Sequence, residues 1–241
     1  MNRNYFDMRK RIKYISLFYF IALLVRYYFV KFEPAFMASI PYTIKGLLGG
    51  ISPILAGSIL VYGFKRKLDY SLFSIGKLNT ILLIILPALL FSLASLIENK
   101  SVSYNLPLLI FASILYGFFE EFGWRGYLQS ELGSLRKIYK YFIISVLWYI
   151  WHLDFGVDLS HLLSYFYVLA GSVGIGYVAD KSKSLVLPAL FHAFFNILLS
   201  NNIDGISFFS KILIVVICTI IIILTMIRTN RKNENRLPNF L

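Results

Sequence analysis

The chain has 241 residues, of which 58% are hydrophobic and only 15% are charged, and its mean hydropathy is +0.70. Globular domains average about 45–50% apolar residues, so this composition leaves too little polar surface for a soluble domain. The formal net charge of +12 comes mainly from short segments between apolar runs. We therefore expect the basic residues to contact anionic lipid heads, and we expect no nucleic-acid partner, because no basic stripe interleaved with aromatics lies in a soluble segment.

Eight apolar runs approach or reach the roughly 20 residues that a helix needs to cross a bilayer. The chain is therefore predicted to be an all-α, polytopic membrane helix bundle that forms a single domain over residues 1–241. The fifth and seventh runs are short, so tilt or local thinning has to accommodate them. The first run follows a basic segment, and no small-residue cleavage site comes after the run. We therefore expect it to remain in the membrane as an anchor. The predicted spans are 14–30, 44–64, 78–97, 106–128, 138–153, 159–178, 185–200 and 207–227.

The basic residues alternate from loop to loop in step with these spans. If the N-terminus is cytoplasmic, 18 basic residues lie in inner segments. Arg26 and Arg125 fall inside spans, and the rest lie in outer loops. This bias follows the positive-inside rule and predicts an even number of spans with both termini in the cytoplasm. The outer-loop basic residues are Lys31, Lys45, Lys100 and Lys211.

Small residues in the second and sixth spans predict close helix packing. The single cysteine, Cys218, excludes an internal disulfide and a cysteine-based zinc cluster, and we expect it to pack within the last span or to face lipid. The small residues are Gly46, Gly49, Gly50, Ala56, Gly57, Gly171, Gly174 and Gly176.

Ionisable and polar side chains gather in three of the spans, where they are costly and by default mark function. At 1.5 Å per residue they lie about 10–18 Å from the cytoplasmic ends of their spans, a similar level that a helix bundle does not require. The third histidine, His161, lies near an outer loop and has no evident partner. The three groups are Glu120, Glu121 and Arg125 in the fourth span, His152 in the fifth, and His192 with Asn196 in the seventh.

Helix geometry separates the two glutamates. Glu121 and Arg125 are four residues apart, so they share a face and are predicted to pair. Glu120 lies about 100° round the helix from Glu121 and lacks a local cation, which suits it to general-base work. His192 and Asn196 also share a face.

Two alternative roles remain open for these residues. The Glu121–Arg125 pair alone could serve as interhelical glue. A zinc site built from Glu120, His152 and His192 is chemically possible. Because no His-Glu-x-x-His helix is present, we expect neither a metal nor a cofactor.

Three motifs in this order resemble the family of CAAX prenyl endopeptidases and bacteriocin-processing proteins (the CPBP or Abi family), which are glutamic intramembrane proteases. Glu-Glu-x-x-x-Arg is matched at Glu120, Glu121 and Arg125. The aromatic-x-x-x-His motif runs from Trp148 to His152, with Trp in place of the commoner Phe, and His-x-x-x-Asn is matched at His192 and Asn196. The resemblance covers about residues 106–199 and places the expected catalytic core at 106–200.

The resemblance implies peptide hydrolysis without a metal or a covalent intermediate. In that scheme Glu120 and His192 activate a water, His152 and Asn196 stabilise the oxyanion, and Glu121 is held with Arg125. The expected protein is a multi-pass enzyme of the cell membrane, of the bacterial branch, that cuts a hydrophobic peptide or a membrane-associated protein.

Two alternatives remain open beside the endopeptidase. One is a non-catalytic bacteriocin-immunity or regulatory membrane protein. The other is a lipoprotein-modifying acyl-transfer enzyme that uses the same site. A transporter is disfavoured, because its polar residues would lie on both sides of the midplane.

Overall fold

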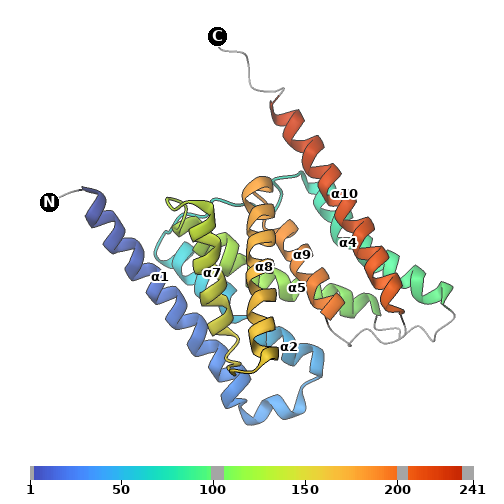
Figure 1. The fold of residues 1–241 in the computed structure, drawn as a ribbon, viewed down its shortest axis with the longest axis horizontal. Helices are drawn as coiled ribbons and strands as arrows, with labels where there is room; N and C mark the ends of the chain where they lie inside the picture. The colour runs from blue at the N-terminus through green and yellow to red at the C-terminus, as the bar shows by residue number, and fades with distance from the viewer. Residues whose placement is uncertain (1–2, 99–105, 200–205, 235–241) are drawn as a thin grey trace.

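The computed structural model describes residues 3–98, 106–199 and 206–234, and helices account for most of them (Figure 1). Within these ranges the single β contact is an isolated bridge between Ser71 and Ser184. The predicted all-α class is therefore confirmed. Lys100, Arg236 and the end of the predicted span 185–200 lie outside the described residues.

Six helical segments in the described ranges are long and apolar enough to cross a membrane. They correspond to six of the eight predicted spans. The fifth and seventh predicted spans form α7 (Lys137–Trp151) and α9 (Val186–Leu199), of only 15 and 14 residues. A polytopic membrane bundle is thus confirmed, and the count of eight crossings stays a prediction. The six segments are Lys10–Phe32, Tyr42–Gly63, Lys77–Ile97, Leu106–Glu131, Leu159–Ser182 and Phe208–Thr229.

Several of these segments are built from more than one helical element. The second is broken at Ile51, just before Pro53, a position in the first helical turn that tolerates proline. The elements outside α7 and α9 are α1 (Arg3–Tyr27), η1 (Tyr28–Phe32), η2 (Ala35–Ser39), α2 (Tyr42–Gly50), α3 (Ser52–Ser58), η3 (Ile59–Gly63), α4 (Lys77–Ile97), α5 (Leu106–Glu121), η4 (Phe122–Leu128), α6 (Gln129–Glu131), α8 (Leu159–Ser182) and α10 (Phe208–Glu234).

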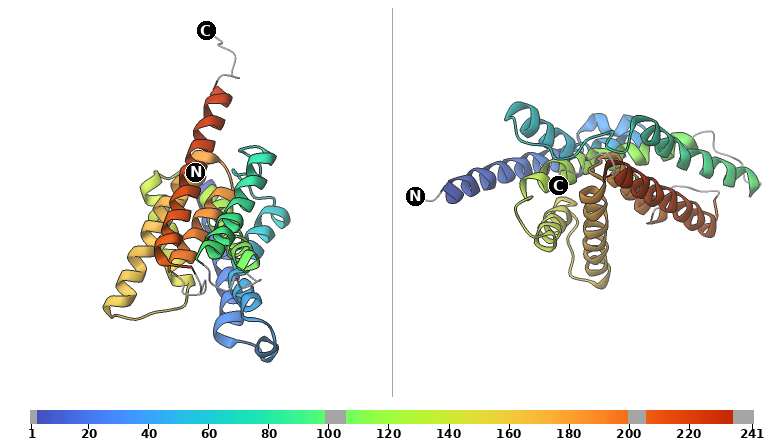
Figure 2. Two further views of the ribbon diagram at one scale, coloured as in Figure 1. Left: turned by 90° about the vertical axis from the view of Figure 1, so that its right-hand side faces the viewer. Right: turned by 90° about the horizontal axis from the view of Figure 1, so that it is seen from above.

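The apolar interior forms two large clusters that lie side by side. One joins α4, α5, α9 and α10, and the other joins α1, α3, η4, α7 and α8. Accordingly α1 lies on one flank of the bundle, and α4 and α10 lie together on the other (Figures 1 and 2). The fourth predicted span runs from the first cluster into the second, and Phe191 of α9 packs against both. The residues at the junction of α5 and η4 therefore lie at the seam between the clusters.

The predicted glycine packing is correct at some positions and wrong at others. A Cβ at Gly50 would lie 2.5 Å from the Tyr116 ring, and one at Gly176 would lie 2.8 Å from the Tyr141 ring. By contrast, a Cβ at Gly46 or Gly174 would meet nothing within 4 Å, because these two glycines face open space. Of the two roles expected for Cys218, the structure shows packing, because this side chain is buried in the α4–α5–α9–α10 cluster.

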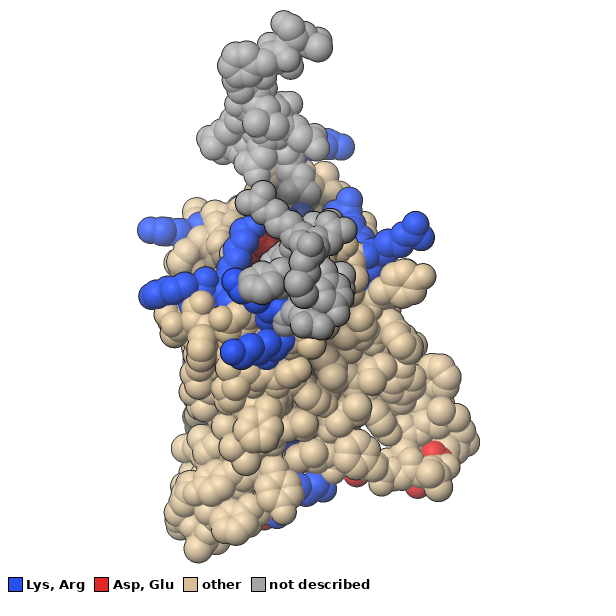
Figure 3. Space-filling model, turned by 90° about the vertical axis from the view of Figure 1, so that its left-hand side faces the viewer, with Lys and Arg blue, Asp and Glu red and all other residues tan. Residues whose placement is uncertain are grey.

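Basic side chains gather at one end of the bundle. The start of α1 and the end of α10 lie at the same end, and Lys and Arg concentrate there (Figures 1 and 3). Lys65, Lys67 and Lys183 are exposed in segments next to membrane-length helices, and Lys181 is exposed in the last turn of α8. This distribution agrees with the predicted inner face, and the cytoplasmic assignment itself stays a prediction.

Candidate active site

The two glutamates lie where the fourth span changes its helical form. The α-helix α5 ends at Glu121, and the π-helical η4 follows directly. A continuous α-helix was expected, so the wider turn is a difference from the prediction. Gly123 makes room for it, because a Cβ there would lie 2.5 Å from Pro53 of α3. Such π turns occur frequently at functional sites.

Glu121 binds two partners through one oxygen. Its Oε1 accepts a hydrogen bond from Arg125 Nη1 at 2.9 Å, with both side chains fully buried, so the predicted pair is confirmed. The same Oε1 lies 2.7 Å from His192 Nδ1. Because an ionised carboxylate only accepts, Nδ1 carries the proton and donates, and Nε2 is left as the other ring nitrogen. Glu121 therefore orients His192 as well as pairing with Arg125, which the sequence did not predict.

Glu120 is held differently from its neighbour. It is 1% exposed, and its Oε2 accepts a hydrogen bond from Trp148 Nε1 at 2.7 Å. Its Oε1 is buried without a hydrogen-bond partner. The guanidinium of Arg125 lies over the Trp148 ring at 4.6 Å, on the same indole that binds Glu120. The aromatic residue of the second motif is thus a donor to Glu120, a contact that phenylalanine could not make.

His152 caps the C-terminal end of α7 and is half-buried. Its Nδ1 lies 2.8 Å from the backbone oxygen of Trp148. A carbonyl oxygen only accepts, so Nδ1 is the protonated nitrogen here too, and Nε2 is available for another group. The Trp148 ring, whose N–H binds Glu120, has its centroid 5.8 Å from that of His152 and 5.3 Å from that of His192. Both imidazoles therefore lie beside the indole that binds Glu120.

Asn196 follows His192 by one turn of α9 and is half-buried. The four-residue spacing places both on one face of the helix. The structure thus brings Glu120, Glu121, Trp148 and His192 together by direct contact. Asn196 is assigned to this set only by its position on α9, one turn after His192.

The close approach of α5 and α9 depends on Gly117, which sequence reasoning did not single out. A Cβ at Gly117 would lie 2.6 Å from the carbonyl oxygen of Ala189 and 3.3 Å from Cβ of His192. A side chain at this position would push α9 away. Gly117 therefore allows His192 to reach Glu121.

The candidate site is poorly suited to binding a metal ion. In residues 3–98, 106–199 and 206–234, no three His, Cys, Asp or Glu side chains are grouped so that they could hold one. Nδ1 of His192 binds Glu121, and Nδ1 of His152 binds a backbone oxygen. A metal-free site stays a prediction.

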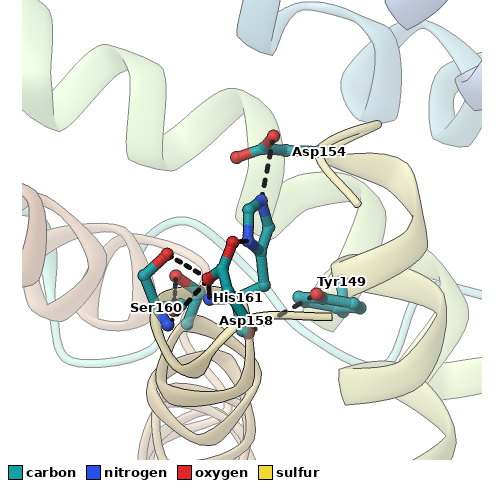
Figure 4. A network of polar contacts seen from close by, with 6 residues as sticks. Tyr149, Asp154, Asp158, Ser160 and His161 are labelled. Carbon is teal, nitrogen blue, oxygen red and sulfur yellow. Dashed lines mark hydrogen bonds and ion pairs between the residues drawn. The ribbon is translucent and has the colours of Figure 1, made fainter. Parts of the chain in front are cut away.

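The expectation that His161 has no partner is wrong. Its Nδ1 lies 2.9 Å from Asp158 Oδ2, and its Nε2 lies 3.6 Å from Asp154 Oδ1 (Figure 4). Asp158 is also the N-cap of α8, accepting from the backbone N–H groups of Ser160 and His161. The loop before α8 folds back over the ring, and Gly156 packs directly against it. Such a loop path cannot be read from residue spacing.

A second polar cluster, also missed from the sequence, surrounds Asp180 near the end of α8. Its Oδ1 accepts from Tyr70 Oη at 2.7 Å and Gln129 Nε2 at 3.0 Å. Its Oδ2 accepts from Lys140 Nζ and Tyr141 Oη, both at 2.7 Å. Burial and the bond to Asp180 raise the pKa of the Tyr70 hydroxyl, which keeps it a donor at neutral pH. We call these five residues the Asp180 cluster; it ties the loop before α4, α6 and α7 to α8.

Comparison with known proteins finds a family match over the part of the chain that holds the candidate site. Residues 102–198 match the family model described as type II CAAX prenyl endopeptidase Rce1-like. The family resemblance is confirmed. The Rce1-like segment contains Glu120, Glu121, Arg125, His152, His192 and Asn196, whereas α1 to α4 lie outside it.

Two curated relatives extend the likeness beyond that segment. Lysostaphin resistance protein A of Staphylococcus haemolyticus is 26% identical over 227 residues, which cover 78% of this chain and 61% of that protein. CAAX prenyl protease 2 of Methanococcus maripaludis is also 26% identical over 227 residues, covering 77% of this chain and 84% of that protein. The chain thus spans about three fifths of the staphylococcal relative. Together the matches show that the chain is similar to CAAX-protease-like proteins over the Rce1-like segment and beyond it.

Proposed function

We propose that the chain is an intramembrane glutamic endopeptidase that hydrolyses a hydrophobic or membrane-associated peptide without a metal or a covalent intermediate. The observation that carries this proposal is the unequal environment of two adjacent buried carboxylates. Glu121 is engaged by Arg125 and His192, whereas Glu120 keeps one buried oxygen without a hydrogen bond. A buried carboxylate oxygen without a donor is a suitable acceptor for the proton of an attacking water.

The proposed first step begins with a water hydrogen-bonded to Glu120 Oε1. Trp148 holds the other oxygen of Glu120, which fixes the direction of Oε1. As the water oxygen attacks the peptide carbonyl carbon, its proton passes to Glu120. His192, oriented by Glu121 through Nδ1, presents Nε2 to the same water. Glu120 then gives its proton to the leaving nitrogen as the C–N bond breaks, which leaves a carboxyl group and an amine.

The developing oxyanion needs donors, and we assign them to His152 and Asn196. A fixed donor of this kind contributes about 3–4 kcal/mol to transition-state stabilisation. The Asn196 amide can donate at any pH. Because Nδ1 of His152 already donates to the Trp148 carbonyl, Nε2 can donate only when the ring is doubly protonated. Activity that relies on His152 should therefore fall as the pH rises through the titration of this imidazole.

The test is comparative peptidomics of cells that express wild type or Glu120→Gln. Products made by wild type should be absent with Glu120→Gln and with His192→Ala. Glu33→Gln is the matched control, because Glu33 forms an ion pair with Lys45 on the exposed surface. If folded Glu120→Gln and His192→Ala proteins retain the full set of cleavage products, the proposal is refuted.

One observation favours a second candidate, a non-catalytic immunity protein: one relative is named for lysostaphin resistance. In that case cells carrying Glu120→Gln would show the same resistance phenotype as wild type. The same strains address the acyl-transfer alternative by mass spectrometry of membrane lipoproteins. A change in lipoprotein acylation without new peptide ends would favour that chemistry.

A further inference from the structure

Arg26 of α1 is a guanidinium within a membrane-length helix, and it lies outside the Rce1-like segment. Its Nη1 donates to the carbonyl oxygen of Gly49 at 2.7 Å, and Cζ lies 4.1 Å from the centroid of the Trp151 ring. Its Nε is buried without a hydrogen-bond partner. Within the described ranges, none of the side-chain ion pairs up to 4.0 Å involves Arg26. A charge inside a membrane-spanning helix is costly and is a functional-site candidate by default.

Tyr116 connects this cation to the glutamate of the site. It precedes Glu120 by one turn of α5, so the two side chains share a face. Its ring meets the His192 ring edge to face, with centroids 5.9 Å apart. The Tyr116 side chain lies close enough to interact electrostatically with both Arg26 and Glu120, while Glu120 Oε1 accepts no hydrogen bond from it in this structure. The series Arg26–Tyr116–Glu120 therefore links α1 to the carboxylate through α5, whereas Trp148 binds the carboxylate from α7.

Two consecutive glycines of α2 provide the space for this chain. A Cβ at Gly49 would lie 3.2 Å from Arg26 Nη1, and one at Gly50 would lie 2.5 Å from Cε2 of Tyr116. Gly46, on the same helix, has nothing within 4 Å of its Cβ position. The absence of side chains at Gly49 and Gly50 thus lets Arg26 and Tyr116 pack directly against the backbone of α2.

We infer that Arg26 and Tyr116 are positioning residues for Glu120, so that the working site extends beyond the Rce1-like segment into α1 and α2. Glu120 Oε1 accepts no hydrogen bond in this structure; in the working site the Tyr116 hydroxyl, one helical turn away and held by Arg26, turns to donate to one lone pair of Oε1 and directs the other toward the water. A carboxylate oxygen has room for both hydrogen bonds. Arg26 also balances the negative charge of Glu120, since Arg125 is already paired with Glu121. This inference rests on the proposed function.

The first test does not depend on proteolysis. Infrared difference spectra of the full-length protein in nanodiscs identify the Glu120 carboxylate band by its loss in Glu120→Gln. We expect this band to shift in Tyr116→Phe, Arg26→Gln and Gly50→Ala. It should stay in place in Gly46→Ala and in Tyr19→Phe, which removes only the bond from α1 to the Leu147 carbonyl of α7. An unmoved band in Tyr116→Phe, or an equal shift in the controls, overturns the inference.

The second test uses a peptide identified as a product-forming substrate by the peptidomics. Tyr116→Phe and Arg26→Gln should lower kcat about 10- to 100-fold, the size expected for losing one hydrogen bond to a charged group. KM should stay within about twofold of wild type, because positioning of Glu120 acts after binding. Arg26→Lys should recover part of kcat. A rise in KM with kcat unchanged would instead make Arg26 a substrate-binding residue and overturn the positioning role.

The two tests separate the possible failures. If wild type cleaves no peptide but the carboxylate band still shifts, the proposed function fails and the contact to Glu120 stands. If wild type cleaves peptide and neither the band nor kcat responds to Tyr116→Phe, the inference fails and the proposed function stands.

Discussion

Two carboxylates, Glu120 and Asp180, lie in the same bundle with opposite surroundings. Asp180 accepts four hydrogen bonds, from Tyr70, Gln129, Lys140 and Tyr141. Glu120 accepts one, from Trp148, and its second oxygen is buried without a partner. A satisfied polar network makes a structure rigid, whereas an unsatisfied buried group needs a functional explanation. The difference indicates that the Asp180 cluster holds the helices together, and it agrees with the catalytic role proposed for Glu120.

Replacing Glu120 should have the largest effect on turnover and a small one on folding. Glu120→Gln keeps the shape of the side chain and removes the proton acceptor, so activity should fall by about 10²–10⁴-fold. The amide can still accept from Trp148, so thermal stability should stay near that of wild type. Turnover of a peptide substrate and the melting temperature in detergent, measured side by side, check this. A large loss of stability with Glu120→Gln would mean that Glu120 resembles Asp180 and is structural.

Replacing Asp180 should show the reverse. Asp180→Asn leaves Lys140 as a buried cation without its counter-charge, because the two side chains are only 8% and 7% exposed. Breaking a buried pair in this way costs roughly 3–5 kcal/mol. Denaturation in mild detergent should report that loss, while kcat per folded molecule stays within about twofold of wild type. The conservative control is Tyr141→Phe, which removes one neutral donor and should cost about 1 kcal/mol.

An intermediate effect is expected from Trp148→Phe, which removes the one hydrogen bond that Glu120 accepts. The aromatic ring under Arg125 is kept, so packing changes little. Activity should fall about 10-fold or more, in line with the loss of a hydrogen bond to a charged group. A kinetic assay of the purified variant checks this. Since phenylalanine is the commoner residue in this motif, unchanged turnover would show that the indole N–H is dispensable and that Glu120 is oriented by other contacts.

The motif spacings predicted a candidate site, several members of which are in contact, and the four-residue spacing predicted the Glu121–Arg125 pair. These are local relations along one helix, and local geometry can be read from sequence. The same reasoning did not reach the second bond of Glu121, to His192, because it depends on how closely α9 approaches α5 at Gly117. The π-helical turn after Glu121 was likewise not visible in an apolar pattern.

Contacts between distant segments were the main omission. Arg26 was recognised as lying inside a span, but its approach to Tyr116 depends on the packing of α1 and α2 against α5. The Asp180 cluster joins residues that are 39 to 110 positions apart. No periodicity in a single sequence encodes such pairings. The fold class followed from hydropathy, because every spanning helix must satisfy its own backbone.

The smallest effect is expected at a third carboxylate, Asp158, which extends the comparison to the surface. Like Asp180 it accepts several hydrogen bonds, from Ser160 and from the ring and backbone of His161 (Figure 4), and these lower its pKa. A carboxylate with a lowered pKa stabilises the folded state above its unfolded value, about 3.9, and this contribution is lost as the pH falls through the lower folded value. Asp158 is exposed, so solvent screens the contribution.

We therefore expect Asp158→Asn to loosen only the first turn of α8. Hydrogen exchange at the Ser160 and His161 amides should accelerate in the variant at neutral pH and approach wild type in acid below the lowered pKa, where Asp158 is protonated. Turnover at Glu120 should be unchanged. If instead turnover fell with the loss of the Asp158–His161 contact, the loop between α7 and α8 would be coupled to His152. Asp158 would then affect turnover, as Glu120 is expected to, and would not be purely structural like Asp180.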